Sequence, residues 1–209
     1  MYEGLICYRA NDGITISQFI PSQVAFGAPG HQWRITLKAD LTAAQSSFSN
    51  PANTTGLVVD LAITCEESSR WTLRIRQPKW AIGPGTVAVD GNPVPTSVSK
   101  DGFIEIVRDW RNEHVTVTFA KRITREPLPG DDRRFALLDG PVVLAALGDG
   151  EPELGDDAAI TPQYEHQYID GREWQSGHFL ARTHRGSVPV MPLYEIADQP
   201  YSVYFSRPQ

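Results

Sequence analysis

The sequence predicts an all-β protein, an antiparallel β-sandwich, and three observations support this prediction. Apolar and polar residues alternate in many short segments; in residues 71–76, for example, Trp71, Leu73 and Ile75 share one face of an extended strand. The 16 prolines and 17 glycines are spread along the chain, as expected for many turns between short strands. Beyond about residue 43, no segment has the 3.6-residue spacing of apolar residues that is typical of a helix.

Five strands are expected in the first 80 residues. They cover residues 5–9, 14–20, 33–38, 57–64 and 71–76. Asn11-Asp12-Gly13 joins the first two as a β-hairpin, because Asp-Gly favours the backbone of a two-residue turn. Pro78 ends the fifth strand, since proline has no N–H to donate to a sheet. Residues 40–55, rich in Ser, Ala, Thr and Asn, are expected to form a long surface loop.

The middle of the chain continues this pattern with clear turn signals. Asp90-Gly91-Asn92 follows a short strand at residues 86–89 and predicts a tight hairpin. Residues 102–108 and 115–119 alternate between apolar and polar residues, as in an antiparallel sheet with one solvated face. A turn at Arg111-Asn112-Glu113 is expected to separate these two strands.

The last third of the chain predicts more strands and one acidic loop. The strands are expected at residues 123–127, 135–138, 141–147, 179–183, 188–194 and 201–205. Asp139-Gly140 joins the second and third of them as a hairpin. Residues 148–157 are acidic and contain Gly and Pro, which predicts a loop or an internal linker. We expect the whole chain to form two small packed β-sandwiches, residues 1–121 and residues 122–209.

The charge and hydropathy of the chain exclude two classes of partner. The formal net charge is −6 and the sequence pI is about 5.3, whereas nucleic-acid binding requires a basic face that displaces counterions. No apolar run approaches the ~20 residues that a membrane-spanning helix needs. The first residues have neither the basic nor the apolar region of a signal peptide. We therefore expect no nucleic-acid partner and no membrane partner, and the sequence assigns no cellular compartment.

No residue pattern points to a catalytic, cofactor-binding or metal-binding site. The histidines lack the spacing of zinc ligands and are expected at the surface or in turns: His31, His114, His166, His178 and His184. Glycoside hydrolysis requires two carboxylates that flank one bond. The adjacent acidic residues lie in turn-like sequence and are expected to be solvated: Glu66-Glu67, Asp131-Asp132 and Asp156-Asp157. The G-x-S-x-G pattern of a serine nucleophile is absent.

The two cysteines, Cys7 and Cys65, are expected to be buried free thiols, because both lie in or beside predicted strands. One disulfide between them is the alternative, which the sequence leaves open because it does not give the distance between the two Cα atoms.

The five tryptophans include one candidate contact for a ligand or partner. Trp33 and Trp71 are in phase with inward apolar residues, which favours a place in the core. Trp80, Trp110 and Trp174 are expected at strand ends or in loops. We choose Trp174, in D-G-R-E-W-Q-S-G-H, as the candidate platform for a sugar or a protein partner, since aromatic faces bind both. The alternative for Trp174 is a structural role alone.

An ordered set of segments resembles one family, the glycoside hydrolase family 127 (β-L-arabinofuranosidase-like) proteins. The matching segments are I-C-Y-R-A-N-D-G-I-T-I-S-Q-F-I-P-S, L-R-I-R-Q-P-K-W-A, V-D-G-N-P, G-F-I-E-I-V-R-D-W, V-T-V-T-F-A-K-R-I-T-R-E, R-F-A-L-L-D-G-P-V-V-L-A and P-L-Y-E-I-A-D-Q-P-Y-S-V-Y-F. They resemble the C-terminal β-sandwich region that follows the catalytic barrel in that family. The resemblance covers nearly the whole chain and is weakest in residues 40–55 and 148–175.

This resemblance implies that the catalytic residues lie outside the chain. The family carries its carboxylate acid/base and its zinc-bound cysteine nucleophile in a helical α/α barrel, so zinc is expected only in that barrel. Neither Cys7 nor Cys65 matches a family ligand. We therefore expect no cofactor in this chain and no activity from this chain alone.

Three functions are compatible with the sequence. The first is a non-catalytic accessory region of a carbohydrate-active enzyme, with the catalytic barrel of the parent protein as its partner. A contact between copies in a homo-oligomer is a further role that such a region can have. The second function is a stand-alone carbohydrate-binding module, and the third is a module that binds another protein.

Overall fold

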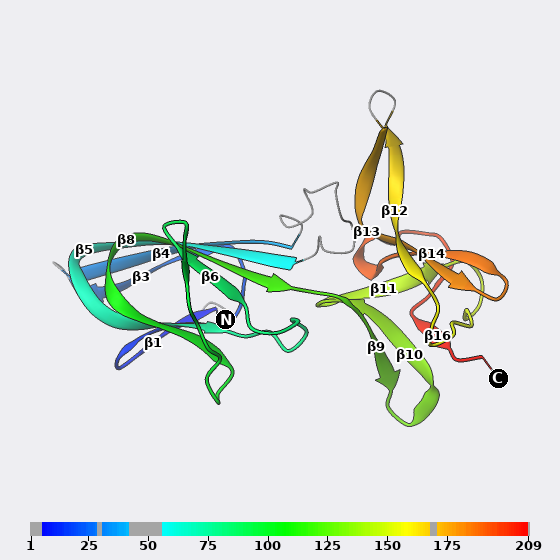
Figure 1. The fold of residues 1–209 in the computed structure, drawn as a ribbon, viewed down its shortest axis with the longest axis horizontal. Helices are drawn as coiled ribbons and strands as arrows, with labels where there is room; N and C mark the ends of the chain where they lie inside the picture. Colours follow the sequence, from blue (N-terminus) through cyan, green and yellow to red (C-terminus); the bar gives the residue numbers. More distant parts are fainter. Residues whose placement is uncertain (1–5, 29–30, 42–55, 168–170, 209) are drawn as a thin grey trace. The chain divides into compact units, whose positions relative to one another are not determined.

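The computed structural model describes residues 6–28, 31–41, 56–167 and 171–208. Side chains are described throughout this part except at residues 28, 31, 162–167 and 171–177. The described chain is almost entirely β-structure, which confirms the all-β prediction (Figure 1). Its one helical element is a short 3₁₀ turn, η4 (Leu193–Glu195). The chain divides into two compact units, Met1–Lys121 and Arg122–Gln209, and each unit has its own eight-stranded sheet.

The first unit contains eight strands that run in the order β1-β2-β5-β8-β6-β7, with β4 and then β3 joined to β5. The strands are β1 (Cys7–Ala10), β2 (Gly13–Ile16), β3 (Ser22–Ala28), β4 (His31–Asp40), β5 (Gly56–Arg76), β6 (Thr86–Val89), β7 (Asn92–Val94) and β8 (Phe103–Ala120). All neighbours are antiparallel except β2 and β5. The sequence did not predict β3, and β2 ends at Ile16 rather than at residue 20.

Strands β5 and β8 are longer than the sequence predicted, and their length determines the architecture of the unit. The expected break after residue 64 and the expected turn at 111–113 are both wrong, since β5 has 21 residues and β8 has 18. The two strands pair from Gly56 opposite Ala120 to Arg76 opposite Phe103, with an irregularity between Thr64 and Ser69. Extra residues at such a bulge bend a strand without ending it.

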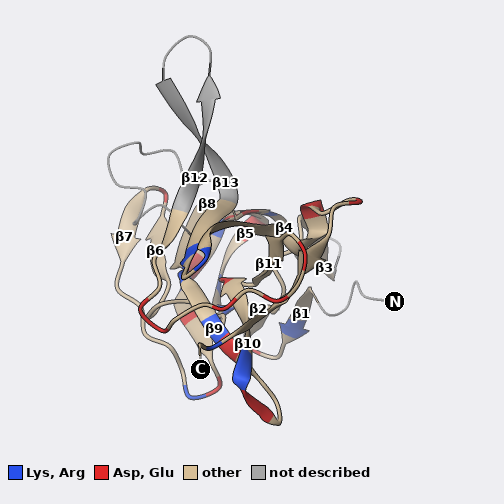
Figure 2. Cartoon of the chain, turned by 90° about the vertical axis from the view of Figure 1, so that its right-hand side faces the viewer, with Lys and Arg blue, Asp and Glu red and all other residues tan. Residues whose placement is uncertain are grey.

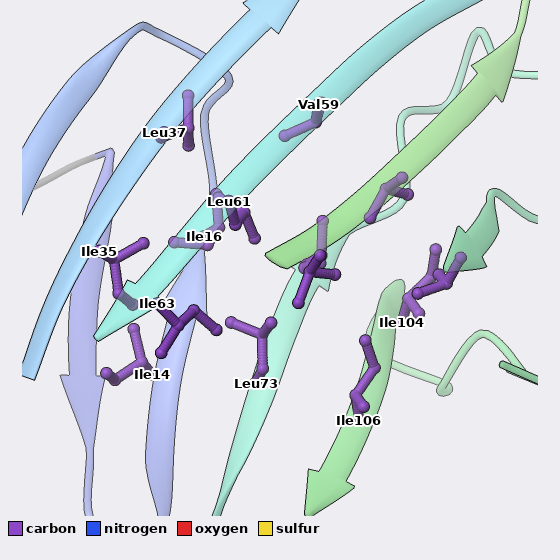
Figure 3. Close-up of a cluster of buried hydrophobic side chains, with 14 of the residues drawn as sticks. Ile14, Ile16, Ile35, Leu37, Val59, Leu61, Ile63, Leu73, Ile104 and Ile106 are labelled. Carbon is purple, nitrogen blue, oxygen red and sulfur yellow. The ribbon is translucent and has the colours of Figure 1, made fainter. Parts of the chain in front are cut away.

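The bend turns one sheet into two layers that enclose the core. The first half of β5 pairs with β4, and the second half pairs with β2. Side chains of both layers are buried in one cluster: Ile14, Ile16, Ile35, Leu37, Val59, Leu61, Ile63, Leu73, Ile75, Ile104, Ile106, Val115, Val117 and Phe119 are among its members. Figure 3 shows many of them directed toward one another. Each such side chain contributes about 1.5–3 kcal/mol when it leaves water, so this cluster is the main stabilising feature of the unit.

The tight turns of the first unit follow the sequence. Asp90 and Gly91 have φ angles of 50° and 77°, the left-handed backbone of a type I′ turn, which confirms the hairpin predicted there. The opening hairpin is also confirmed, because Ala10 is opposite Gly13. Residues 42–55, most of the predicted surface loop, lie outside the described residues.

The first hairpin is fixed to β5 by its turn. The Thr72 N–H donates to the Asp12 carbonyl oxygen at 2.9 Å, and the Arg74 guanidinium donates to both carboxylate oxygens of Asp12 at 2.9 and 2.6 Å. The hydrogen bond from Arg74 holds the pKa of Asp12 below its usual value, and the same contact raises the pKa of Arg74. Gly13 is essential for this approach, since a Cβ there would lie 1.9 Å from the Thr72 carbonyl oxygen.

The second unit contains the remaining strands in the order β12-β13-β14-β11-β10-β16, with β9 paired to β10 and β15 paired to β11. They are β9 (Ile123–Leu128), β10 (Asp131–Asp139), β11 (Val142–Leu147), β12 (Ile160–Gln167), β13 (Gly171–Thr183), β14 (Gly186–Pro192), β15 (Tyr201–Ser202) and β16 (Tyr204–Ser206). Its core includes Phe135 and Phe205, whose stacked ring centroids are 5.9 Å apart. The hairpin at Asp139-Gly140 is confirmed, as is the loop over residues 148–157, whereas β12 was not predicted.

We predict that Gly13→Ala destabilises the first unit by about 3 kcal/mol, because the added methyl group must push β2 away from β5. The control is Gly91→Ala, where φ is +77° and no atom lies within 4 Å, so only the backbone preference is lost, about 1 to 2 kcal/mol. Urea unfolding of both variants checks the difference. Equal losses would show that β2 does not approach β5 as described.

Candidate interaction surface

One end of the first unit brings together aromatic side chains from three separate segments. Phe19 follows β2, Trp80 lies in the loop after β5, and Phe119 lies near the end of β8. The ring centroid of Phe119 is 5.4 Å from that of Phe19 and 6.5 Å from that of Trp80. This aromatic group covers the end of the sandwich core.

The loop that carries Trp80 is held in one conformation by the side chain of Gln77. Its amide nitrogen donates to the Gly83 carbonyl at 2.9 Å, and its amide oxygen accepts from the Gly85 N–H at 3.0 Å. Gly85 also lies against Phe119, whose ring would be 2.5 Å from a Cβ at that position. The loop is therefore ordered before any partner binds.

Two isoleucines extend the aromatic group toward solvent. Ile20 follows Phe19, and the Ile82 N–H donates to the Ala120 carbonyl at 2.9 Å, so both residues lie next to the ring contacts. Ile20 is 48% exposed and Ile82 is 47% exposed. We call this surface the apolar end; it consists of Phe19, Ile20, Trp80 and Ile82, and the fully buried Phe119 ring packs against the Phe19 and Trp80 rings.

The other exposed apolar residues of the first unit stand among charged residues. Tyr8 and Val107 lie on strands, and Val107 is next to Glu105, which accepts a hydrogen bond from Arg74 at 3.2 Å. Single exposed apolar residues are ordinary on protein surfaces, whereas neighbouring ones mark interaction sites. The apolar end is therefore the better candidate for an interaction surface.

Three tryptophans form a stack at the bend of the sheet, and this stack corrects one prediction. The ring centroids of Trp33 and Trp71 are 5.5 Å apart, and those of Trp71 and Trp110 are 5.1 Å apart. Trp71 is buried and Trp33 is half-buried against the core, as predicted. Trp110 was expected at a strand end or in a loop but is fully buried, because β8 continues through it. Arg9 and Arg108 cover rings at the two ends of the stack.

The candidate platform Trp174 lies in β13 opposite Tyr164, and its side chain is outside the described part. Its proposed role therefore stays a prediction. Of the histidines, His178 is the one that is both largely enclosed and paired, with Nε2 2.6 Å from a Glu195 carboxylate oxygen. The side chains of His31 and His166 are outside the described part.

The adjacent acidic residues are less turn-like than predicted. Glu66-Glu67 lie in β5 near its irregular segment, and Asp131-Asp132 begin β10, whereas Asp156-Asp157 do lie in a turn. Acidic and basic residues are mixed in the β9–β10 hairpin, where Asp131 and Asp132 precede Arg133 and Arg134 (Figure 2). Opposite charges that are interspersed in this way do not form the single basic face that nucleic acids need.

Both cysteines are free and buried in the described structure, as predicted. Burial raises the pKa of Cys7 to about 12, and burial together with the charge of Glu113 raises the pKa of Cys65 to about 11. No group of three or more His, Cys, Asp or Glu side chains that could hold a metal ion exists among the described residues.

The family comparison agrees with the strand pattern of the first unit. Residues 13–120, more than half of the chain, match the family profile described as the β-L-arabinofuranosidase GH127 middle domain. The chain belongs to this GH127 middle-domain family. The GH127 resemblance inferred from the sequence is confirmed, and the profile names the matched region a middle domain rather than a C-terminal one.

Solved structures share the fold of nearly the whole GH127 chain described here. A GH127 β-L-arabinofuranosidase from Geobacillus stearothermophilus T6 is 18% identical, with a TM-score of 0.68 over 97% of this chain and 35% of that chain. A GH127 β-arabinofuranosidase is 17% identical, with a TM-score of 0.62 over 95% of this chain and 35% of that chain. A structure described as a glycoside hydrolase is 14% identical, with a TM-score of 0.67 over 98% of this chain and 37% of that chain.

The chain thus spans about a third of the length of the solved structures that it matches. At these identities the likeness concerns the fold alone. No curated protein matches the sequence. Within the described residues, no helix has the length and apolar character needed to cross a bilayer.

We predict that neither thiol of the folded chain reacts with Ellman's reagent at pH 8. The thiolate is the reactive form, and with a pKa of about 11 only about one Cys65 thiol in a thousand is ionised at that pH. Unfolding in guanidinium restores the ordinary pKa, so two thiols should then react at once. Rapid labelling of Cys65 in the folded chain would contradict its burial.

Proposed function

We propose that this chain is a non-catalytic accessory region of a GH127 glycoside hydrolase, which packs against and supports a helical catalytic barrel in the parent protein. The catalytic groups and zinc of that parent are expected in the barrel. The family match and the length of the solved relatives support a partner within one longer polypeptide. The proposed role is mechanical: the region covers part of the barrel and fixes its loops.

The apolar end is the observation that carries this proposal. Ile20 and Ile82 are about half exposed beside the Phe19, Trp80 and Phe119 rings, so a docked domain would remove further apolar area from water. Gln77 already orders the loop, which lowers the entropy lost on docking. A surface that is apolar and preformed suits a permanent intramolecular contact. A second copy of the chain is the other occupant that the experiment below distinguishes.

A carbohydrate-binding module is the second candidate, because the second unit exposes several aromatic side chains. Tyr194, Tyr201 and Tyr204 are 73%, 50% and 40% exposed and lie within one C-terminal segment. Aromatic rings with a polar tip are common where proteins meet sugars or other proteins. This candidate places recognition on the second unit, whereas the accessory role depends on the first.

We predict that the double variant Ile20→Asp/Ile82→Asp lowers the binding of the dye 8-anilinonaphthalene-1-sulfonate (ANS) to the purified chain at least about twofold, because it breaks the apolar end. The matched control is Val107→Asp, which places the same charge at another branched apolar residue. Val107 is 54% exposed on the sheet face, away from the apolar end, so this change should leave dye binding unchanged. Light scattering after gel filtration, measured on the same proteins, shows whether copies of the chain associate through this surface. Equal dye binding by the unsubstituted chain and the double variant would contradict the proposal.

The non-catalytic part of the proposal has its own measurement. The purified chain should not cleave an aryl β-L-arabinofuranoside. Cleavage at a rate that stays constant through repurification would show that the chain itself is the enzyme.

A further inference from the structure

A cavity in the second unit lies between two loops that the accessory role does not use. Its volume is about 250 Å³. One wall is the acidic loop after β11, with Asp149, Glu151 and Glu153, and the other is the β13–β14 turn, with His184 and Arg185. Pockets for drug-sized ligands are typically ~300–1,000 Å³, so this cavity is suited to a smaller molecule.

Backbone hydrogen bonds fix the acidic loop at both ends. The Gly148 N–H donates to the Pro200 carbonyl at 2.9 Å, and the Leu154 N–H donates to the Ser206 carbonyl at 2.8 Å. Glu151 is held as well, because the Arg134 guanidinium lies 2.9 Å from its carboxylate. This wall of the cavity is therefore preformed rather than created by a ligand.

The opposite wall is held by a tight turn. Thr183 pairs with Gly186 across the hairpin, and the Arg185 N–H donates to the Thr183 hydroxyl oxygen at 3.2 Å. The Thr183 hydroxyl donates in turn to the Gly186 carbonyl at 2.8 Å. These bonds fix the backbone that presents Arg185 at the cavity.

Three charged groups at the cavity have no ion pair in the described part of the chain. They are the Asp149 and Glu153 carboxylates and the Arg185 guanidinium, whereas Glu151 is neutralised by Arg134. Carboxylates accept hydrogen bonds, and a guanidinium donates up to five. The cavity thus offers free acceptors and free donors at once.

The chemistry of these groups selects one class of ligand. The described residues include no group of three or more acidic, His or Cys side chains that could hold a metal ion, which argues against a cation. Two unpaired carboxylates against one guanidinium disfavour an anion. An apolar molecule would remove water from unpaired charges at a large energetic penalty. A neutral molecule with several hydroxyl groups satisfies both kinds of group.

We infer that this cavity binds one neutral sugar residue, so that the second unit is a non-catalytic saccharide-binding site. Tyr201 supports the assignment. It is directly opposite Leu147, which lines the cavity, so the two side chains are on the same face of the sheet with Cβ atoms ~5 Å apart. Tyr201 does not itself line the cavity, but a sugar that extends out of it past Leu147 would meet the half-exposed Tyr201 ring with its apolar face.

The test is a titration of the ¹⁵N-labelled 209-residue chain, followed by NMR, with methyl β-L-arabinofuranoside as the neutral probe. Calcium chloride and sodium glucuronate serve as cationic and anionic probes. We expect saturable shifts of the Gly148, Gly150 and Gly186 amides with the neutral sugar only. The dissociation constant should be on the order of millimolar, as for a single small ligand.

Variants assign the binding to the cavity. Asp149→Asn/Glu153→Gln and Arg185→Gln should each weaken sugar binding at least about tenfold. The control Asp198→Asn, an exposed acid of the same unit, should leave it unchanged. Tyr201→Ala should weaken binding, whereas Tyr194→Ala should not. Dispersed NMR spectra of each variant show that it is folded.

Several results would overturn the inference. They are the absence of shifts at about 50 mM sugar, well above the expected millimolar constant, saturable shifts with calcium or glucuronate instead, or cavity variants that bind as the unsubstituted chain does. The inference is independent of the docking proposal. Ile20→Asp/Ile82→Asp changes only the first unit and should leave the sugar titration unchanged, so the two proposals fail separately.

Discussion

The contact between Trp71 and Trp110 holds the bend on which the first unit depends. Both side chains are buried, their ring centroids are 5.1 Å apart, and the Trp110 indole nitrogen donates to the Trp71 carbonyl at 3.0 Å. The contact lies directly after the irregular pairing between Thr64 and Ser69, where β5 and β8 curl together (Figure 1). Because the strands bend there without ending, the two halves of one sheet face each other and enclose a common core.

This constraint explains which parts of the fold the sequence could predict. Alternation identified the inward rows of β5 and β8, and Asp-Gly pairs identified the hairpins, because both signals are local. The continuity of the long strands was missed, since the polar residues 66–70 interrupt the alternation where the bulge changes the phase of the side chains. The same error placed Trp110 at a strand end. Strand β3 did carry a signal, the alternation of Val24 and Phe26. This strand lies at the edge of the sheet and its alternation is too short to identify it.

The two candidate sites could not be predicted, for a different physical reason. Phe19, Trp80 and Phe119 are far apart in sequence and two of them lie outside strands, so no periodicity links them. The cavity of the second unit is likewise built from two loops, and the sequence predicted its acidic segment only as a loop or an internal linker. Only tertiary structure shows that Glu151 is paired, whereas Asp149 and Glu153 have no ion pair with any described residue. Family resemblance, in contrast, was available from the sequence because it depends on ordered local segments.

Native-state hydrogen exchange tests the central claim most directly, since it reports the free energy needed to open each amide hydrogen bond. If β5 is one bent strand with a common core, residues 57–63 and 71–75 should exchange with the same opening free energy. As denaturant is added, the opening free energies of both segments should converge on the free energy of global unfolding of the unit. Independent exchange of the two halves, with one opening at a much lower free energy, would contradict the account.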